Sequence, residues 1–369
     1  MIYYLGNYLR DLAPIFSFLR LVDYISFRAI AAAITAFLLT LILGRRLIRE
    51  LYIRKKRDVV RDYGVMSVND KKGTPTMGGI LIVAAVFLSA LLWCDPINRF
   101  VGLTLLALLW FAAIGLTDDV LKIRHQDSDK GLSQGRKILL QGIYSALLGV
   151  IYLVPALSPF PPEIASNLYL PFVKFPVVDL GWVYLPFIIF TLLAISNSVN
   201  FADGLDGLAV VPASFIAAVY GVFAYVIGNT IYSGYLHFFY LPGVWELTVV
   251  CAAIFGAGIG FLWYNTYPAQ IFMGDTGSMA LGGVLGTLAV LLKQEFLFVL
   301  IGGIFVTEAF SVFIQEKIGI HWLGRRLFYR APIHHTYQYR GLAETKVVVR
   351  FWIVSGLLAL AGLATLKIR

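Results

Sequence analysis

Ten apolar segments, each about as long as a membrane-crossing helix, constrain the fold of this chain more than any other feature. They lie near residues 27–44, 77–93, 100–117, 138–155, 182–199, 207–227, 247–265, 279–292, 296–314 and 349–366. A helix needs about 20 mostly apolar residues to span a bilayer. Hydrophobic residues make up 59% of the chain, charged residues 14%, and the mean hydropathy is +0.80. The sequence therefore predicts an all-α polytopic membrane protein, with residues 1–369 as one integral membrane domain.

We predict about ten transmembrane helices. Only Lys293, Gln294 and Glu295 separate the eighth segment from the ninth, so nine spans are an alternative. Segments 45–76, 118–137 and 315–348 hold 10, 5 and 6 of the 30 Lys and Arg residues, and each follows an odd-numbered span. Positive loops stay in the cytoplasm, so we expect both termini outside, in the periplasm. The net charge of +9 suits anionic lipid headgroups or an anionic substrate, and we expect no nucleic-acid partner.

The segment from Asn200 to Ala209 places two carboxylates between two apolar runs. Asp203 and Asp206 each cost roughly 2.5 to 3.5 kcal/mol if they lie near the middle of a span. Their spacing of three puts them on one face of a helical turn, and Gly204 and Gly207 leave the backbone open to a ligand. This pattern favours a polar ligand or a cation. The alternative is a turn in which an Asp caps the next helix.

Two further predicted cytoplasmic loops carry carboxylates. Lys122 follows Asp118 by four residues and Asp119 by three, so on a helix it can reach either carboxylate. Asp275 lies between small residues at the start of the next apolar run. A solvated helix end explains the first pair without function, and a helix cap explains Asp275. If the loops meet, their hard oxygen ligands select Mg²⁺, with Mn²⁺ possible.

Basic residues lie in the same predicted loops. Lys72 precedes the second span and Lys137 begins the fourth, where each can contact phosphate or only anchor a helix end. His334 and His335 are adjacent, which does not match the usual spacing of zinc ligands. The pair suits proton handling or phosphate contact, although histidines in such a loop are usually solvated.

Residues 156–181 are rich in proline and aromatic residues and lie in a predicted periplasmic loop. Residues 169–175 and 177–184 resemble two short strands, so we predict a small periplasmic β-hairpin. We expect it to be structural. The catalytic chemistry is instead expected at the opposite face, where Asp118, Asp119, Asp203, Asp206, Asp275 and His334 come together on the cytoplasmic side. There the residues indicate metal-assisted phosphoryl transfer between a soluble phosphorylated substrate and a membrane-bound one.

These motifs resemble a known family. The resemblance rests on residues 74–79, Asp118-Asp119-x-x-Lys122, 200–209, 265–278 and 331–335, in family order and at suitable spacing. The chain resembles the bacterial phospho-N-acetylmuramoyl-pentapeptide transferases, within the polyprenyl-phosphate N-acetylhexosamine-1-phosphate transferase superfamily. The resemblance implies a ten-helix homodimer in the bacterial cytoplasmic membrane. It implies transfer of phospho-MurNAc-pentapeptide from UDP-MurNAc-pentapeptide to undecaprenyl phosphate, which gives lipid I and UMP with Mg²⁺.

The resemblance also implies roles for individual residues. Asp275 matches the magnesium aspartate with Asp118 beside it, and Asp119 matches a proposed base. Lys122 and His334 complete the expected catalytic set. The residues expected to bind substrate are Lys72, Thr74, Lys137, Asn197, Asn200, Asp203, Gly204, Leu205, Asp206, Asn265, Phe272, Gln315 and His335. Among these, Gly204 to Asp206 with Phe272 match the uridine pocket, and Gln315 falls near the same cleft.

One segment departs from the family pattern. The family shows three consecutive histidines and then Glu two residues later, whereas Thr336 and Gln338 occupy the third-histidine and Glu positions here. The main alternative is a sister enzyme that uses UDP-GlcNAc or another UDP-hexosamine. A transporter whose carboxylates carry protons or cations is a remote alternative. Transport sites lie at the midplane of the membrane, whereas the carboxylates here are expected at one face.

Overall fold

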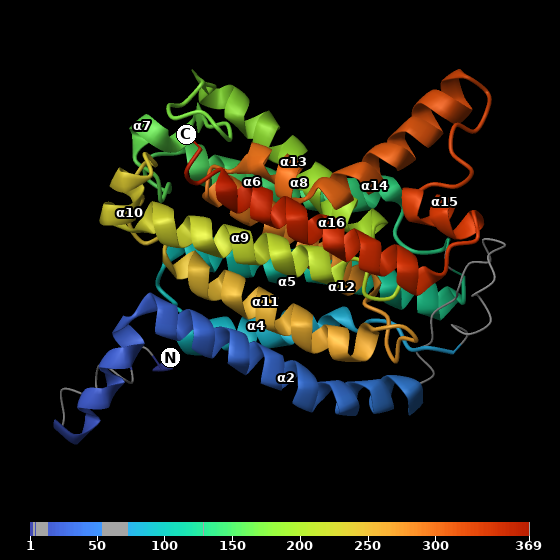
Figure 1. Ribbon diagram of the computed structural model, residues 1–369, viewed down its shortest axis with the longest axis horizontal. Coiled ribbons are helices and arrows are strands. Elements are labelled where there is room, and N and C mark those ends of the chain that lie inside the picture. Colours follow the sequence, from blue (N-terminus) through green and yellow to red (C-terminus); the bar gives the residue numbers. More distant parts are fainter. Residues whose placement is uncertain (3, 5–13, 54–72, 128, 369) are drawn as a thin grey trace.

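The computed structural model describes residues 1, 2, 4, 14–53, 73–127 and 129–368. Helices running roughly along one axis form a bundle, with one small two-stranded sheet (Figure 1). The longer elements are η1 (Pro14–Asp23), α2 (Ile25–Ile53), α4 (Gly79–Trp93), α5 (Arg99–His125), α6 (Gln134–Leu153), α8 (Tyr184–Phe201), α9 (Val210–Gly228), α11 (Glu246–Asn265), α12 (Gly274–Leu291), α14 (Gly303–Phe313), η3 (Ile314–Trp322) and α16 (Glu344–Ala364). The short elements are α7 (Pro162–Ala165), η2 (Gly181–Val183), α10 (Thr230–Tyr235), α13 (Glu295–Ile301) and α15 (Ile333–Tyr339).

Every one of the ten predicted apolar segments contains a helix. Within the described ranges, seven helices are long and apolar enough to cross a membrane, or eight if the bent pair of α13 and α14 with η3 counts as one span. Helix α4 has only 15 residues, and α12 contains an aspartate and four internal glycines that lower its hydropathy. The chain is thus a multi-pass membrane protein, and the count of ten spans stays a prediction.

Helix α12 forms the centre of the bundle. All its residues from Thr276 to Leu291 are buried, and it packs against α5 and α8. A Cβ added to Gly282 would lie 2.7 Å from the Cα of Ser196, which shows how closely the α12 and α8 backbones approach. Gly256 of α11 lies equally close to α2, where an added Cβ would lie 2.0 Å from the carbonyl oxygen of Ala33. Small residues therefore act as close packing positions in both helices.

The outer helices expose apolar stripes. Ile30, Ile34, Leu38 and Ile42 follow one face of α2 at helical spacing, and all four are exposed. On α16, Ile353, Leu357 and Leu360 do the same. Exposed apolar surface of this extent marks contact with lipid or with another apolar partner.

Both chain termini lie at one end of the bundle (Figure 1). The N-terminal amino group donates to the carbonyl oxygen of Leu91 near the end of α4, and Lys367 lies over the ring of Tyr235 in α10. We call this the terminal end. The other end, which we call the site end, is made by the C-terminal ends of α5, α8 and α11 and the N-terminal ends of α6, α12 and α16.

The predicted hairpin exists at the terminal end of the bundle, but its predicted bounds are wrong. The strands are β1 (Asn167–Leu168) and β2 (Val178–Asp179), antiparallel, with Asn167 opposite Asp179. Pro171 and Pro176 have no backbone N–H to donate, which excludes the segment between them from a ladder. Hydrogen bonds from the Ser166 side chain and the Gly181 N–H lower the pKa of the Asp179 carboxyl and hold the turn that follows.

One helix pair is sharply bent. Helices α13 and α14 meet at 88°, with Gly302 between them. A Cβ on Gly302 would lie 2.7 Å from the carbonyl oxygen of Phe298, so the bend requires glycine. Beyond the bend, α14 leads into η3, which projects from the bundle near α15 (Figure 1).

Candidate active site

The predicted site segments meet at the site end of the bundle. The ammonium group of Lys137 on α6 lies 2.7 Å from Asp275 on α12, and Asn200 on α8 donates to Ser278, one turn further along α12. The backbone N–H of Asp206 donates to Glu344 on α16. The prediction that these loops share one end of the bundle is confirmed. Which side of the membrane that end faces stays a prediction.

Two carboxylates share two lysines at the centre of this site. Lys122 Nζ lies 2.6 Å from Asp118 Oδ2 and 3.2 Å from Asp275 Oδ2. Lys137 Nζ lies 2.9 and 2.7 Å from the same two oxygens. The Asp118 side chain is fully buried, whereas those of Asp275, Lys122 and Lys137 are 17%, 27% and 20% exposed. The group is therefore closed on the protein side and open on the other, where a charged ligand can reach it.

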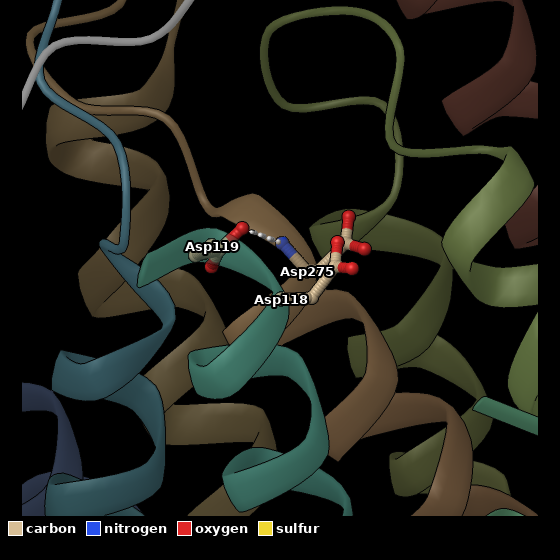
Figure 2. Close-up of side chains that lie close together, drawn as sticks. All are labelled: Asp118, Asp119 and Asp275. Atoms are coloured by element: carbon tan, nitrogen blue, oxygen red, sulfur yellow. Dashed lines mark hydrogen bonds between the residues drawn. The ribbon is translucent and has the colours of Figure 1, made fainter. Parts of the chain in front are cut away.

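Asp119 points in a different direction from Asp118, as Figure 2 shows. Its carboxylate accepts from the backbone N–H groups of Asp275 and Thr276, at 3.0 and 2.9 Å, and from the Thr276 hydroxyl at 2.6 Å. The side chain is almost completely buried. A carboxylate at this position satisfies free N–H groups at the start of α12 and complements the helix dipole. The predicted contact of Lys122 with Asp118 is confirmed, while the oxygens of Asp119 are occupied by α12.

Backbone contacts fix the distance between α5 and α12. A Cβ on Gly115 of α5 would lie 2.1 Å from the carbonyl oxygen of Asp275. A Cβ on Gly79 of α4 would lie 2.1 Å from the backbone nitrogen of Gly277. Such distances leave no space for any side chain, so α4, α5 and α12 meet directly beside the carboxylates.

The loop after α8 is held by α11, by the loop that follows α11 and by α16. Asp206 Oδ2 accepts from the Ala269 N–H at 3.0 Å, and Asn265 Oδ1 accepts from the Gly207 N–H at 2.9 Å. Trp352 of α16 donates to the carbonyl oxygen of Gly207. Asp206 and Asn265 are buried. Their contacts hold the loop in place, whereas Asp203 and Gly204 remain accessible at its surface.

The two histidines lie below this loop on α15. The imidazole of His334 is fully buried, and its Nδ1 lies 3.1 Å from Glu308 Oε2 on α14. A Cβ on Gly204 would lie 2.4 Å from His334 Nε2, so the glycine and the ring are in close contact. His335 Nδ1 lies 3.0 Å from the Gln338 side-chain oxygen. Thr336 donates to the carbonyl oxygen of Arg330 at 2.5 Å, so both residues that depart from the family pattern make local contacts.

Other predicted substrate residues lie away from the carboxylates. Gln315 is buried and accepts from the N–H groups of Leu327 and Phe328. Asn197 donates to Gln141 and to the Leu193 carbonyl, between α8 and α6. Thr74 lines a cavity of about 630 Å³ with residues of α2, including Arg45 and Arg49. Leu205 is buried, Phe272 is half-buried, and Lys72 lies outside the described residues.

Sequence reasoning missed several residues that hold the site. Thr276 donates to Asp119, and Glu344 accepts from the Asp206 N–H. Glu308 lies beside His334, and nothing in the sequence identified the two as partners. The hydroxyl of Thr276, directly after Asp275, was the one local signal, because Thr in a first turn often bonds a capping group.

The carboxylates fit a divalent metal ion. Asp118, Asp119 and Asp275 each offer an oxygen within 4.8 Å of the others. Asp118 Oδ2 is buried, and the ammonium groups of Lys122 and Lys137 lie 2.6 and 2.9 Å from it, where they balance its charge. Hard oxygen ligands of this kind suit Mg²⁺ or Mn²⁺. Asp118 and Asp275 lie together beside the two partly exposed lysines and suit the ion best, whereas the Asp119 carboxylate accepts from the first turn of α12.

Comparisons with known proteins identify the family. Residues 101–293 match glycosyl transferase family 4, and residues 71–83 match phospho-N-acetylmuramoyl-pentapeptide-transferase signature 1. The chain is 45% identical over 370 residues to the phospho-N-acetylmuramoyl-pentapeptide-transferase of Citrifermentans bemidjiense, covering 100% of both chains. It is also 45% identical, with the same coverage, to that of Geobacter sp. strain M21. With the carboxylate site described above, these matches establish that the chain belongs to the phospho-N-acetylmuramoyl-pentapeptide-transferase family.

Proposed function

We propose that this chain transfers phospho-MurNAc-pentapeptide from UDP-MurNAc-pentapeptide to undecaprenyl phosphate, with lipid I and UMP as products. The relatives named above carry this transferase activity in their names, and they match the whole chain. The observation that carries the proposal is the pair of Asp118 and Asp275 with Lys122 and Lys137 between them. Carboxylates and ammonium groups at one bundle end suit phosphoryl transfer to a lipid phosphate.

The lysines and the aspartates of the site have different proposed roles. Lys122 and Lys137 balance two carboxylates and are partly exposed, so their ammonium groups can turn toward the phosphates of the incoming donor. We propose Mg²⁺, or Mn²⁺ in its place, as the cofactor held by Asp118 and Asp275. When bound, the ion neutralises charge on the phosphoryl oxygens as a Lewis acid.

Asp119 takes a positioning role in this scheme. Its three hydrogen bonds hold the first turn of α12, which sets the backbone of Asp275. The assignment of Asp119 as base, implied by the family resemblance, competes with these contacts. The Asp118 carboxylate instead contacts the two lysines through Oδ2 and accepts from the Leu132 N–H through Oδ1.

The open side of the site receives the donor. Asp203, Gly204 and Phe272 lie at or near the accessible surface of the two site loops, where we propose that they contact the uridine end of the substrate. We propose that the site end faces the cytoplasm of a bacterium, because segments 45–76, 118–137 and 315–348, whose described residues lie at that end, hold 10, 5 and 6 of the 30 Lys and Arg residues. The apolar stripes of α2 and α16 are available to lipid and to a second copy in a homodimer.

Release of UMP tests the function. Purified protein in detergent receives undecaprenyl phosphate with either UDP-MurNAc-pentapeptide or UDP-GlcNAc, each with Mg²⁺, with Mn²⁺ or with a chelator. We expect UMP and a lipid-linked muramyl product only with the first donor and a metal ion. Release with UDP-GlcNAc alone would assign the chain to the sister activity. Ion flux in liposomes without UMP release would indicate a transporter.

A further inference from the structure

A buried acid lies behind one of the site histidines. Glu308, on α14, and His334, on α15, are both 0% exposed, and Oε2 lies 3.1 Å from Nδ1. Within the described ranges, neither the Glu308 carboxylate nor the His334 ring makes any other side-chain hydrogen bond. A carboxylate buried inside a bundle is costly unless it faces a proton or a cation. The imidazole is therefore the group that accounts for Glu308.

The opposite edge of the same ring faces the site loop. A Cβ on Gly204 would lie 2.4 Å from Nε2, and Gly204 itself is exposed. This loop adjoins the carboxylates, because Asn200 donates to Ser278 on α12. The ring thus has one nitrogen beside a buried acid and the other buried against the backbone of the exposed Gly204.

We propose that Glu308 is a positioning residue that acts through His334. A carboxylate beside Nδ1 keeps the proton on that nitrogen, because the proton on one ring nitrogen is set by the partner of that nitrogen. Nε2 then presents its lone pair to the loop as a hydrogen-bond acceptor. Glu308 contacts no substrate in this scheme, and the proposal rests on the proposed function for its kinetic consequence.

The bend between α13 and α14 makes this contact possible. Gly302 lets α14 leave α13 at 88°, and α14 then packs against α15. A straight helix would carry Glu308 along the bundle axis. The bend therefore places an acid of one helix behind a histidine of another.

Nuclear magnetic resonance of ¹⁵N-labelled histidine tests the pair without any turnover. The chain has only five histidines, so a His334→Asn sample assigns the His334 signals by difference. We expect the neutral ring of the wild type to carry its proton on Nδ1, and Glu308→Leu to move the proton largely to Nε2. Glu308→Gln, which keeps an acceptor, should retain the wild-type pattern. An unchanged pattern in Glu308→Leu would overturn the proposal.

Kinetics supply the second readout. We expect Glu308→Leu to lower kcat for UMP release by about 10- to 100-fold with a smaller change in KM, and Glu308→Gln to restore much of that loss. Glu295→Leu removes a buried acid at the terminal end and is the matched control, with kcat per folded molecule unchanged. A purely structural Glu308 would lower thermal stability and leave kcat per folded molecule intact, which would also overturn the proposal. If the wild type releases no UMP, the proposed function fails while the resonance experiment still tests the pair.

Discussion

One group of charged side chains inside the bundle lies at the terminal end, and another lies at the site end. At the terminal end, Arg28 of α2 makes two contacts of 2.7 and 2.8 Å with the carboxylate of Glu246 on α11, and both side chains are nearly fully buried. The Asp95 N–H and the Trp93 carbonyl also contact this pair. At the site end, Asp118 and Asp275 share two lysines that reach solvent.

The two groups differ in how their charges are paired. The Arg28–Glu246 pair is matched one to one in bidentate geometry, which suits Arg and leaves no position for a ligand. At the site end each ammonium group contacts two carboxylates, so the same charges can rearrange around a third partner. A closed pair such as Arg28–Glu246 joins two helices. Carboxylates that share partly exposed lysines can instead bind and release a charged ligand.

The largest effect should come from removing a shared carboxylate. Asp275→Asn removes a proposed metal ligand and the partner of both lysines, so we expect UMP release to fall by more than about 100-fold. Expression, detergent behaviour and melting temperature should remain close to wild type. Asp127→Asn, on the exposed loop after α5, is the matched control and should keep full activity. Activity above about a tenth of wild type in Asp275→Asn would argue against a role in catalysis.

Breaking the closed pair should act on stability instead. Arg28→Met leaves Glu246 buried without its partner, and we expect a loss of about 3 to 5 kcal/mol in unfolding free energy, with kcat per folded molecule unchanged. The double variant Arg28→Met with Glu246→Leu should regain most of the lost stability, since apolar side chains replace a buried pair well. Thermal unfolding measured by size-exclusion chromatography, together with UMP release, checks both. A fall in kcat in the folded double variant would contradict the comparison.

An exposed ion pair should give the smallest effect on stability and activity. Lys130 lies 3.4 Å from Asp127, with side chains 64% and 38% exposed. Exposed ion pairs contribute about 0 to 1 kcal/mol, so Lys130→Ala should change neither stability nor UMP release beyond measurement error. A substantial loss of activity would mean that the open side of the site extends over this loop.

The sequence predicted which charged residues gather at the site better than it predicted the contacts that each of them makes. The ten apolar segments and the loops with Asp118 and Asp275 follow from hydropathy and charge alone. Lys122 was placed beside Asp118 by helical spacing, a local rule. The contacts of Asp119 with Thr276, of Asn265 with Gly207 and of Glu308 with His334 join distant segments, and no periodicity encodes them.

The hairpin is a second case in which the local sequence did not determine which residues pair. Aromatic and β-branched residues suggested strands at 169–175 and 177–184, but pairing was restricted to two residues on each side. Pro171 lies inside the first predicted strand and should have shortened it, whereas the second predicted strand contains no proline. The turn at Asp179 and packing at the terminal end set the register of the two strands. Local strand propensity does not predict either of them.

The backbone contacts of Gly79 and Gly115 have a consequence for the choice of cation. Since α4, α5 and α12 touch without intervening side chains, the main chains that carry Asp118 and Asp275 are in direct contact and hold the two carboxylates close together. Mg²⁺ accepts short and regular oxygen ligands, whereas Ca²⁺ needs longer bonds and more of them. These glycines, which are not themselves ligands, therefore favour the smaller ion in the proposed metal site.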